Sequence, residues 1–343
     1  GHEECPLFTR AEKGLKMEHL LEVKNLSVSI DGPAGEVQAV RDVSFSLKKG
    51  EVLAIVGESG CGKSVLCKSI MKLLPPSAKI KEGSICVNGQ DITCYREKEM
   101  QKLRGRVFSM IFQDPMTSLN PTIKIGKQIG EAVVIHNKNY TKEQVNKKVL
   151  ELMELVGISH PKERYHQYPW QFSGGMRQRC VMAIALAADP DILFADEPTT
   201  ALDVTIQAQI LDLLRNLKNK INSSIMLITH DLGVIAEMAD YVVVMYAGRV
   251  VEKGTVQEIF ANPSHPYTIG LMASKPVIGK KVDKLYSIPG KVPNPVNMPD
   301  YCYFRDRCEM PCPAAAPAPW GMRRRRGPPA AVPSAAPAPA LPP

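Results

Sequence analysis

The fold is decided by one short stretch of the sequence, Gly57-Glu58-Ser59-Gly60-Cys61-Gly62-Lys63-Ser64. It matches the pattern G-x-x-x-x-G-K-[ST] of loops that bind nucleotide phosphates. Its glycines let the backbone turn tightly and present successive N–H groups to phosphate oxygens. We expect the whole stretch to bind a nucleotide, with Lys63 at the β- and γ-phosphates and Ser64 on a Mg²⁺ ion.

The residues on either side of this phosphate loop supply the context that it needs. The run 52–56 is continuously apolar, which is typical of a strand buried on both faces of a parallel sheet. The apolar spacing over 65–74 predicts a helix that Pro75-Pro76 ends. Such a helix points the positive end of its dipole at the phosphates. A strand, a glycine loop and a helix in this order favour phosphate binding over a simple surface turn.

A second apolar run, 192–195, ends in two acids, Asp196 and Glu197. We expect Asp196 to hold Mg²⁺ through water and Glu197 to polarise the attacking water as a general base. An acidic pair after a strand can also cap a helix. The phosphate loop in the same chain favours the catalytic interpretation.

The rest of the chain alternates between strand and helix patterns. Period-two alternation predicts antiparallel strands before the phosphate loop, and short apolar runs separated by a helical pattern predict a parallel sheet. The predicted strands and hairpins are 23–30, 37–47, 83–95 (turning at Asn88-Gly89), 107–112, 192–195, 225–228 and 241–252. The predicted helical segments are 123–136, 142–156, 177–188, 205–220 and 255–275, of which the first three form an insert between two strands of one sheet.

Composition narrows the class of protein. Of the 343 residues, 44% are apolar, and no apolar run reaches the length of about 18 that a membrane-spanning helix needs. The net charge of +8 invites a nucleic-acid interpretation. Four of these charges form the run Arg323–Arg326, however, and the remaining charge of about +4 is ordinary for this size. The nine cysteines lack the even spacing of a disulfide framework, which favours a reducing compartment.

The segment before 177–188 carries a family resemblance. Its residues Phe172-Ser173-Gly174-Gly175-Met176 are similar to the ABC signature L-S-G-G-Q, and Ser173 lies 23 residues before Asp196. With the phosphate loop and the acidic pair, the chain therefore resembles the ATPase subunits of ABC transporters. The resemblance implies that Ser173, Gly174 and Gly175 close over the γ-phosphate held by a facing subunit, not over the nucleotide of their own chain.

Three further residues match motifs of this family in order along the chain. The resemblance implies that Gln113 contacts Mg²⁺ or its water, that Asp203 lies at the dimer seam, and that His230 senses the γ-phosphate, 33 residues after Glu197. Family members often stack adenine on an aromatic side chain before the phosphate loop. Residues 28–37 contain no aromatic side chain, so we expect an aliphatic contact instead.

Several segments, most of them near the C-terminus, resemble one group within the family, the importers of oligopeptides, dipeptides and nickel. The matching segments are 113–115 with 118–121, 262–268, 289–290 and 302–308. In this group the last segment carries cysteines, some similar to ligands of a [4Fe–4S] cluster. Such clusters normally take four thiolates, and this chain offers Cys302, Cys308 and Cys312. An iron–sulfur cluster, a zinc site and unligated thiols all stay open, and the fourth ligand is missing or external.

The resemblance implies an α/β fold: the P-loop NTPase core of an ABC ATPase with an antiparallel β subdomain, an inserted helical subdomain and a C-terminal extension. We expect five regions along the chain. They are a non-native leader at 1–16, the core at 17–112 and 190–255, the helical subdomain at 113–189, the extension at 256–312 and a low-complexity tail at 313–343.

The implied function is ATP hydrolysis that powers import of dipeptides or oligopeptides, with ATP and Mg²⁺ sandwiched in a head-to-tail dimer. The implied partners are two membrane permease subunits, a second ATPase that is the same or a related chain, and indirectly an extracytoplasmic peptide-binding protein. No nucleic acid is expected, and the implied location is peripheral, on the cytoplasmic face of the membrane. Two alternatives stay open: an ABC ATPase of DNA repair or translation, and a regulatory module that senses redox state through its cysteines.

Overall fold

The computed structural model describes residues 19–33, 35–199, 203–221, 223–274, 286–296, 298 and 301–309. The predicted leader and the predicted tail lie outside these residues, as does Cys312. The described residues form two β-sheets with helices packed against them, which confirms the predicted α/β class.

The first sheet is antiparallel, and its strands come from the sequence on both sides of the phosphate loop. Its four strands run in the order β2-β1-β4-β5. Their bounds are β1 (His19–Gly32), β2 (Gly35–Lys48), β4 (Ala78–Val87) and β5 (Gln90–Asp91). Val28 of β1 faces Val40 of β2, and both are buried, as the period-two alternation predicts. The hairpin predicted at Asn88-Gly89 is confirmed by the pairing of Val87 with Gln90.

The second sheet has six strands in the order β10-β9-β3-β8-β7-β6. Their bounds are β3 (Val52–Val56), β6 (Phe108–Ile111), β7 (Ile192–Asp196), β8 (Ser224–Ile228), β9 (Tyr241–Tyr246) and β10 (Arg249–Thr255). All neighbours pair in parallel except β10, which is antiparallel to β9. β8 lies between β3 and β7 and pairs in parallel with both, so the carboxyl ends of these three strands lie at one edge of the sheet.

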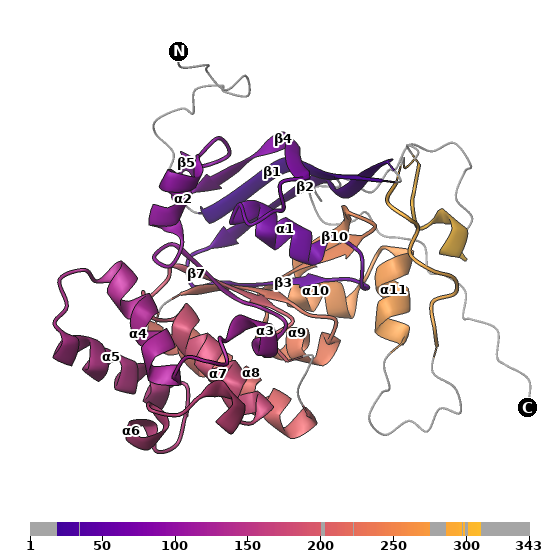
Figure 1. Ribbon diagram of the computed structural model, residues 1–343. Helices are drawn as coiled ribbons and strands as arrows, with labels where there is room; N and C mark the ends of the chain where they lie inside the picture. Colours follow the sequence, from indigo (N-terminus) through magenta and orange to yellow (C-terminus); the bar gives the residue numbers. More distant parts are fainter. Residues whose placement is uncertain are drawn as a thin grey trace, which may run out of the picture.

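The helices cover both faces of this sheet (Figure 1). Helix α1 (Lys63–Ile70) packs with the antiparallel sheet against one face. The opposite face is covered mainly by helices inserted between β6 and β7, together with α8 (Val204–Ile221) and α9 (Leu232–Met238). The inserted elements are α3 (Pro115–Ser118), α4 (Ile125–His136), α5 (Lys142–Leu155), α6 (Pro161–Arg164), η1 (Pro169–Gln171) and α7 (Gly174–Ala185).

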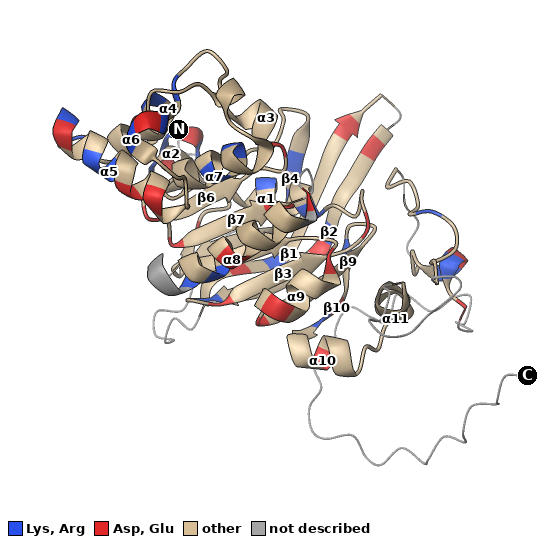
Figure 2. Cartoon of the chain, turned by 90° about the horizontal axis from the view of Figure 1, so that it is seen from below, with Lys and Arg blue, Asp and Glu red and all other residues tan. Residues whose placement is uncertain are grey.

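The inserted helices follow the amphipathic pattern that the sequence predicts. On α5, Val145, Val149, Leu152 and Met153 are buried. Figure 2 shows residues of both charge signs interspersed along the same helix. An apolar stripe therefore holds the helix to the core while its charged face meets solvent.

One helical prediction needs correction, and one short helix escapes the sequence analysis. The helix predicted over 65–74 ends at Ile70, because Lys72 takes a left-handed conformation with φ of 52° that an α-helix cannot continue. The short helix α2 (Glu97–Leu103) was not predicted, and it buries only Met100, so it carries no apolar periodicity.

The region predicted as helical over 255–275 contains two helices, α10 (Val256–Ala261) and α11 (Pro266–Ala273). Asn262-Pro263 separates them, since proline cannot continue a helix. The side chain of His265 caps α11 by accepting a hydrogen bond from the Tyr267 N–H at 3.0 Å. These helices, with the short 3-10 turn η2 (Arg305–Arg307), pack on β3 and β9.

His265 makes the stability of this region sensitive to acid. Burial lowers its pKa to about 4, with Glu252 acting more weakly in the opposite direction. Between about pH 6.5 and 4 the unfolded chain therefore binds more protons at this site than the folded chain. We expect the free energy of unfolding to fall by roughly 3 kcal/mol as the pH drops through this window.

Urea unfolding at several pH values, for the parent and for His265→Asn, would measure this. Asparagine keeps an acceptor for the cap but does not titrate there. The difference in unfolding free energy between the two proteins should change across the window, and a constant difference would contradict the assignment.

Candidate functional site

The phosphate loop spans the gap between β3 and α1, at the edge where β3, β7 and β8 end. Ser59 and Gly60, at its tip, are exposed, whereas Cys61 is fully buried and anchors the returning chain. Gly62 is the N-cap of α1, so the loop leads directly into the helix. The free N–H groups of the first helical turn therefore point into the loop, as phosphate binding requires.

Lys63 curls back over the loop. Its Nζ donates to the carbonyl oxygens of Gly57 at 2.8 Å and Glu58 at 2.9 Å, and its side chain is only 5% exposed. The same Nζ lies 3.9 Å from a carboxylate oxygen of Glu197. A buried cation thus stands between the loop and the end of β7, where it can meet the charge of terminal phosphates.

Ser64 and Asp196 meet across the two elements that carry them. The Ser64 hydroxyl donates to the Asp196 carboxylate at 2.9 Å, although the residues are 132 positions apart. Burial raises the pKa of Asp196, and the hydrogen bond from Ser64 opposes that shift. A hydroxyl and a carboxylate are hard oxygen donors of the kind that Mg²⁺ prefers, so this pair fits the predicted ion.

Glu197 has partners of its own. Gln113 Nε2 donates to its Oε2 at 3.3 Å, and His230 Nδ1 lies 3.6 Å from the same oxygen. Its backbone N–H donates to the Ile228 carbonyl at 3.0 Å, which ties the residue to the end of β8. The two adjacent carboxylates at the end of β7 therefore face different partners: Asp196 contacts Ser64, and Glu197 lies between Gln113 and His230.

The signature residues lie on the helical side of the molecule. Ser173 is the N-cap of α7, and its hydroxyl accepts a hydrogen bond from the Met176 N–H at 3.4 Å. Ser173 and Gly174 are exposed. Within the described residues, no hydrogen bond or ion pair joins Ser173, Gly174 or Gly175 to the phosphate loop. The chain thus presents this helix start outward, away from its own loop.

Asp203 starts α8, next to the signature helix. Its carboxylate accepts a hydrogen bond from the Ile206 N–H at 3.0 Å, so Asp203 caps α8. Residues 200–202, which precede it, lie outside the described part of the chain. A seam between two subunits remains a prediction for Asp203.

Two residues that sequence reasoning left without a role contact the phosphate loop. The Tyr267 hydroxyl accepts a hydrogen bond from the Glu58 N–H at 2.8 Å, and the Arg307 guanidinium contacts the Glu58 carboxylate at 2.6 Å. Both lie in C-terminal segments that carry the family resemblance, which was the only sequence signal for them.

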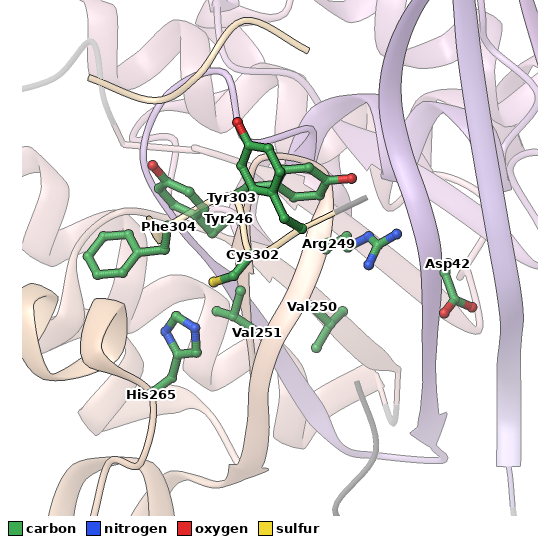
Figure 3. Close-up of a pocket in the computed structure, with 10 residues that line it drawn as sticks. Asp42, Tyr246, Arg249, Val250, Val251, His265, Cys302, Tyr303 and Phe304 are labelled. Carbon is green, nitrogen blue, oxygen red and sulfur yellow. The ribbon is translucent and has the colours of Figure 1, made fainter. Parts of the chain in front are cut away.

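The cysteine cluster gains no support as a metal site. Cys302 and Cys308 are partly buried against the core formed with β9 and α11, and Cys312 is not among the described residues. In the described ranges no three His, Cys, Asp or Glu side chains are placed to hold a metal ion. Cys302 instead lines a pocket of about 150 Å³ with His265, Arg249 and Tyr303 (Figure 3).

Two protein families match this chain, one over the region with the phosphate loop and one over the C-terminal region. The family described as ABC transporter matches residues 40–200, and the one described as oligopeptide/dipeptide transporter, C-terminal region, matches 251–313. The dipeptide transport ATP-binding protein DppD of Lactococcus lactis subsp. cremoris is 57% identical over 282 residues, which cover 82% of this chain and 81% of that protein. The oligopeptide transport ATP-binding protein OppD of Bacillus subtilis is 57% identical over 287 residues, which cover 83% and 80%.

Solved structures share the fold. A dimer of the ATP-binding cassette MJ0796 bound to ADP and Pi superposes with a TM-score of 0.62 at 25% identity, covering 69% of this chain and 98% of that one. The protein cbiO1 from Clostridium perfringens, part of the ABC transporter complex cbiONQ, gives a TM-score of 0.62 at 28% identity, covering 71% and 92%. No helix in the described part of the chain combines the length and the hydrophobicity needed to cross a membrane.

Proposed function

Because the chain belongs to the ABC transporter ATP-binding proteins, in the group of the dipeptide and oligopeptide transport subunits, we propose that it hydrolyses ATP to drive the import of such peptides across a membrane. The cassettes of known structure support an ATP-driven dimer. The cargo rests on the two relatives at 57% identity, one a dipeptide and one an oligopeptide transport protein.

The observation that carries this proposal is the convergence of four groups at one sheet edge. Lys63 and Ser64 come from the loop after β3, and Asp196 and Glu197 from the end of β7. They are linked by the contacts from Ser64 to Asp196 and from Lys63 to Glu197. A cation for phosphates, oxygen donors for Mg²⁺ and a carboxylate base are together the set that phosphoryl transfer needs.

The chemistry of the site follows from these positions. Lys63 neutralises the terminal phosphates and holds the γ-phosphate in place. Ser64 and Asp196 would hold Mg²⁺, which neutralises charge that develops on the phosphate oxygens when it is bound. Glu197 takes a proton from water as the water oxygen bonds to the γ-phosphorus, and the bond to the β-phosphate oxygen breaks to release ADP. His230, whose Nδ1 lies 3.6 Å from a Glu197 carboxylate oxygen, would contact the γ-phosphate as well.

The outward-facing signature supports a shared site. Ser173, Gly174 and Gly175 of one subunit would cover the γ-phosphate on the phosphate loop of another, in a head-to-tail dimer. The partner is a second copy or a related chain, and two permease subunits would take up the movement. The chain would then sit on the cytoplasmic face of the membrane, held by those subunits.

Nucleotide-driven dimerisation tests this proposal. Light scattering of the Glu197→Gln variant should give twice the monomer mass when Mg-ATP is added, because trapped ATP is bound by both subunits. The control adds Gly174→Arg to the same variant. It keeps the chain's own phosphate loop and the Ser173 cap but places a bulky cation on the exposed signature, so it should bind ATP and stay monomeric.

A Glu197→Gln protein that binds ATP yet stays monomeric would overturn the self-sufficient dimer and point to a related partner chain. An iron–sulfur cluster at Cys302, Cys308 and Cys312 remains a separate hypothesis. An anaerobic preparation without bound iron would remove it.

A further inference from the structure

Every polar group of Glu58 makes a hydrogen bond, although the next two residues of the loop, Ser59 and Gly60, are exposed. Its N–H donates to the Tyr267 hydroxyl at 2.8 Å. Its carbonyl oxygen accepts from Lys63 Nζ at 2.9 Å. Its carboxylate accepts two hydrogen bonds from Arg307, at 2.6 and 3.0 Å. Glu58 is thus a point at which hydrogen bonds from the C-terminal segments fix the phosphate loop.

Arg307 is a rigid anchor. Its side chain is 5% exposed, and its Nε donates to the Pro289 carbonyl at 2.6 Å. It also donates to the Tyr246 hydroxyl at 3.3 Å, and its guanidinium lies over the rings of Tyr246 and Phe304, 5.7 and 5.9 Å from their centres. The hydrogen bonds to Glu58 raise the pKa of Arg307. A guanidinium held on several sides has little freedom left to follow a moving loop.

Tyr267 is equally fixed. Its side chain is fully buried, with its ring 4.7 Å from the Tyr246 ring and 5.5 Å from the Phe304 ring. It lies on α11, 209 positions from Glu58, while Arg307 lies on η2, 249 positions away. Two separate elements of the C-terminal extension therefore converge on one residue of the phosphate loop.

Glu58 passes this constraint to Lys63. The Lys63 ammonium is placed by two loop carbonyls, those of Gly57 and Glu58. A loop rich in glycine has many conformations of similar energy, so its ordered form needs an external tether. If Glu58 moves, one of the two acceptors that place the ammonium moves with it.

We propose that the C-terminal extension sets the affinity of the phosphate loop for nucleotide, with Arg307 and Tyr267 acting as positioning residues that fix Glu58 and, through its carbonyl, Lys63. The inference rests on the proposed function, because it assumes that this loop binds ATP. It assigns the extension a part in nucleotide binding, in addition to its packing on β9.

The first test compares Arg307→Gln with Arg305→Gln. Arg305 lies in the same 3-10 turn but is exposed and lies over the Tyr301 ring, so it controls for loss of a nearby positive charge. Calorimetric titration should show Mg-ATP binding weakened about tenfold by Arg307→Gln, because the buried pair is broken while partly exposed Glu58 can recover some hydration. Arg305→Gln should bind ATP as the parent does.

Two milder variants guard against a general loss of structure. Tyr267→Phe keeps the ring and removes the hydroxyl that accepts from the Glu58 N–H, and it should weaken binding about threefold. Glu58→Gln removes the charge that Arg307 holds. The double variant Glu58→Gln with Arg307→Gln should bind no more weakly than the poorer single variant, because both changes break the same contact.

The melting temperature of each nucleotide-free variant separates positioning from stability. Arg307→Gln that melts at a lower temperature yet binds Mg-ATP like the parent would overturn the inference and leave a purely structural ion pair. Fully additive effects of Glu58→Gln and Arg307→Gln would also overturn it. A parent protein that binds no Mg-ATP would overturn the proposed function and the inference together, which distinguishes the two failures.

Discussion

The Glu197→Gln variant is expected to bind Mg-ATP about as tightly as the parent protein and to hydrolyse it about a thousandfold more slowly. The amide keeps the size of the carboxylate, so the contacts of the loop with the phosphates stay intact. It cannot accept a proton from water, however, and the general base is lost. Single-turnover hydrolysis and equilibrium ATP binding, measured on the same preparation, would separate the two effects.

Glu237→Gln is the matched control, since that exposed carboxylate pairs with Arg215 at 2.7 Å and lies near the end of α9 that is further from His230. It should turn over ATP at the parent rate. His230→Ala tests the alternative that His230 is the general base, because His230 Nδ1 lies 3.6 Å from a carboxylate oxygen of Glu197. Near-normal turnover by Glu197→Gln, together with complete loss in His230→Ala, would show that the histidine is the base.

The parts of this site that could be predicted are those that depend on short contiguous stretches of sequence. The glycine pattern at 57–64 fixes a loop between a strand and a helix, and the acids after 192–195 fix a strand end. Parallel strands that lie next to each other bring such ends to one edge, so the meeting of Ser64 and Asp196 follows once the sheet is recognised. The helix patterns over 123–136 and 142–156 were found to within a few residues for the same reason.

The parts that could not be predicted depend on contacts distant along the chain or on one backbone angle. Nothing in the spacing of Arg307 connects it to Glu58, 249 positions away, since its burial arises only when η2 packs against β9. The early end of α1 depends on the φ angle of Lys72, and lysine has no marked preference for that conformation. The cap on α11 uses His265, which is outside the usual set of capping residues.

Substitution of Gly62 by alanine is expected to have the second large effect, and Gly60 offers the comparison that explains it. Both residues have positive φ, 90° at Gly62 and 81° at Gly60, so alanine at either position strains the backbone by about 1–2 kcal/mol. Only at Gly62 is the space also filled. A Cβ there would lie 2.2 Å from the carbonyl oxygen of Ala39 on β2, whereas a Cβ on Gly60 would meet nothing within 4 Å.

Because the obstacle at Gly62 is backbone and not a flexible side chain, either β2 or the start of α1 must move. We expect Gly62→Ala to lower the free energy of unfolding by about 3 kcal/mol or more and to abolish measurable Mg-ATP binding. Gly60→Ala should cost only the conformational strain, about 1–2 kcal/mol, and retain binding. Urea unfolding and ATP titration of both variants would check this. Equal losses of stability would mean that φ alone, and not the close approach of β2, makes glycine necessary at the start of α1.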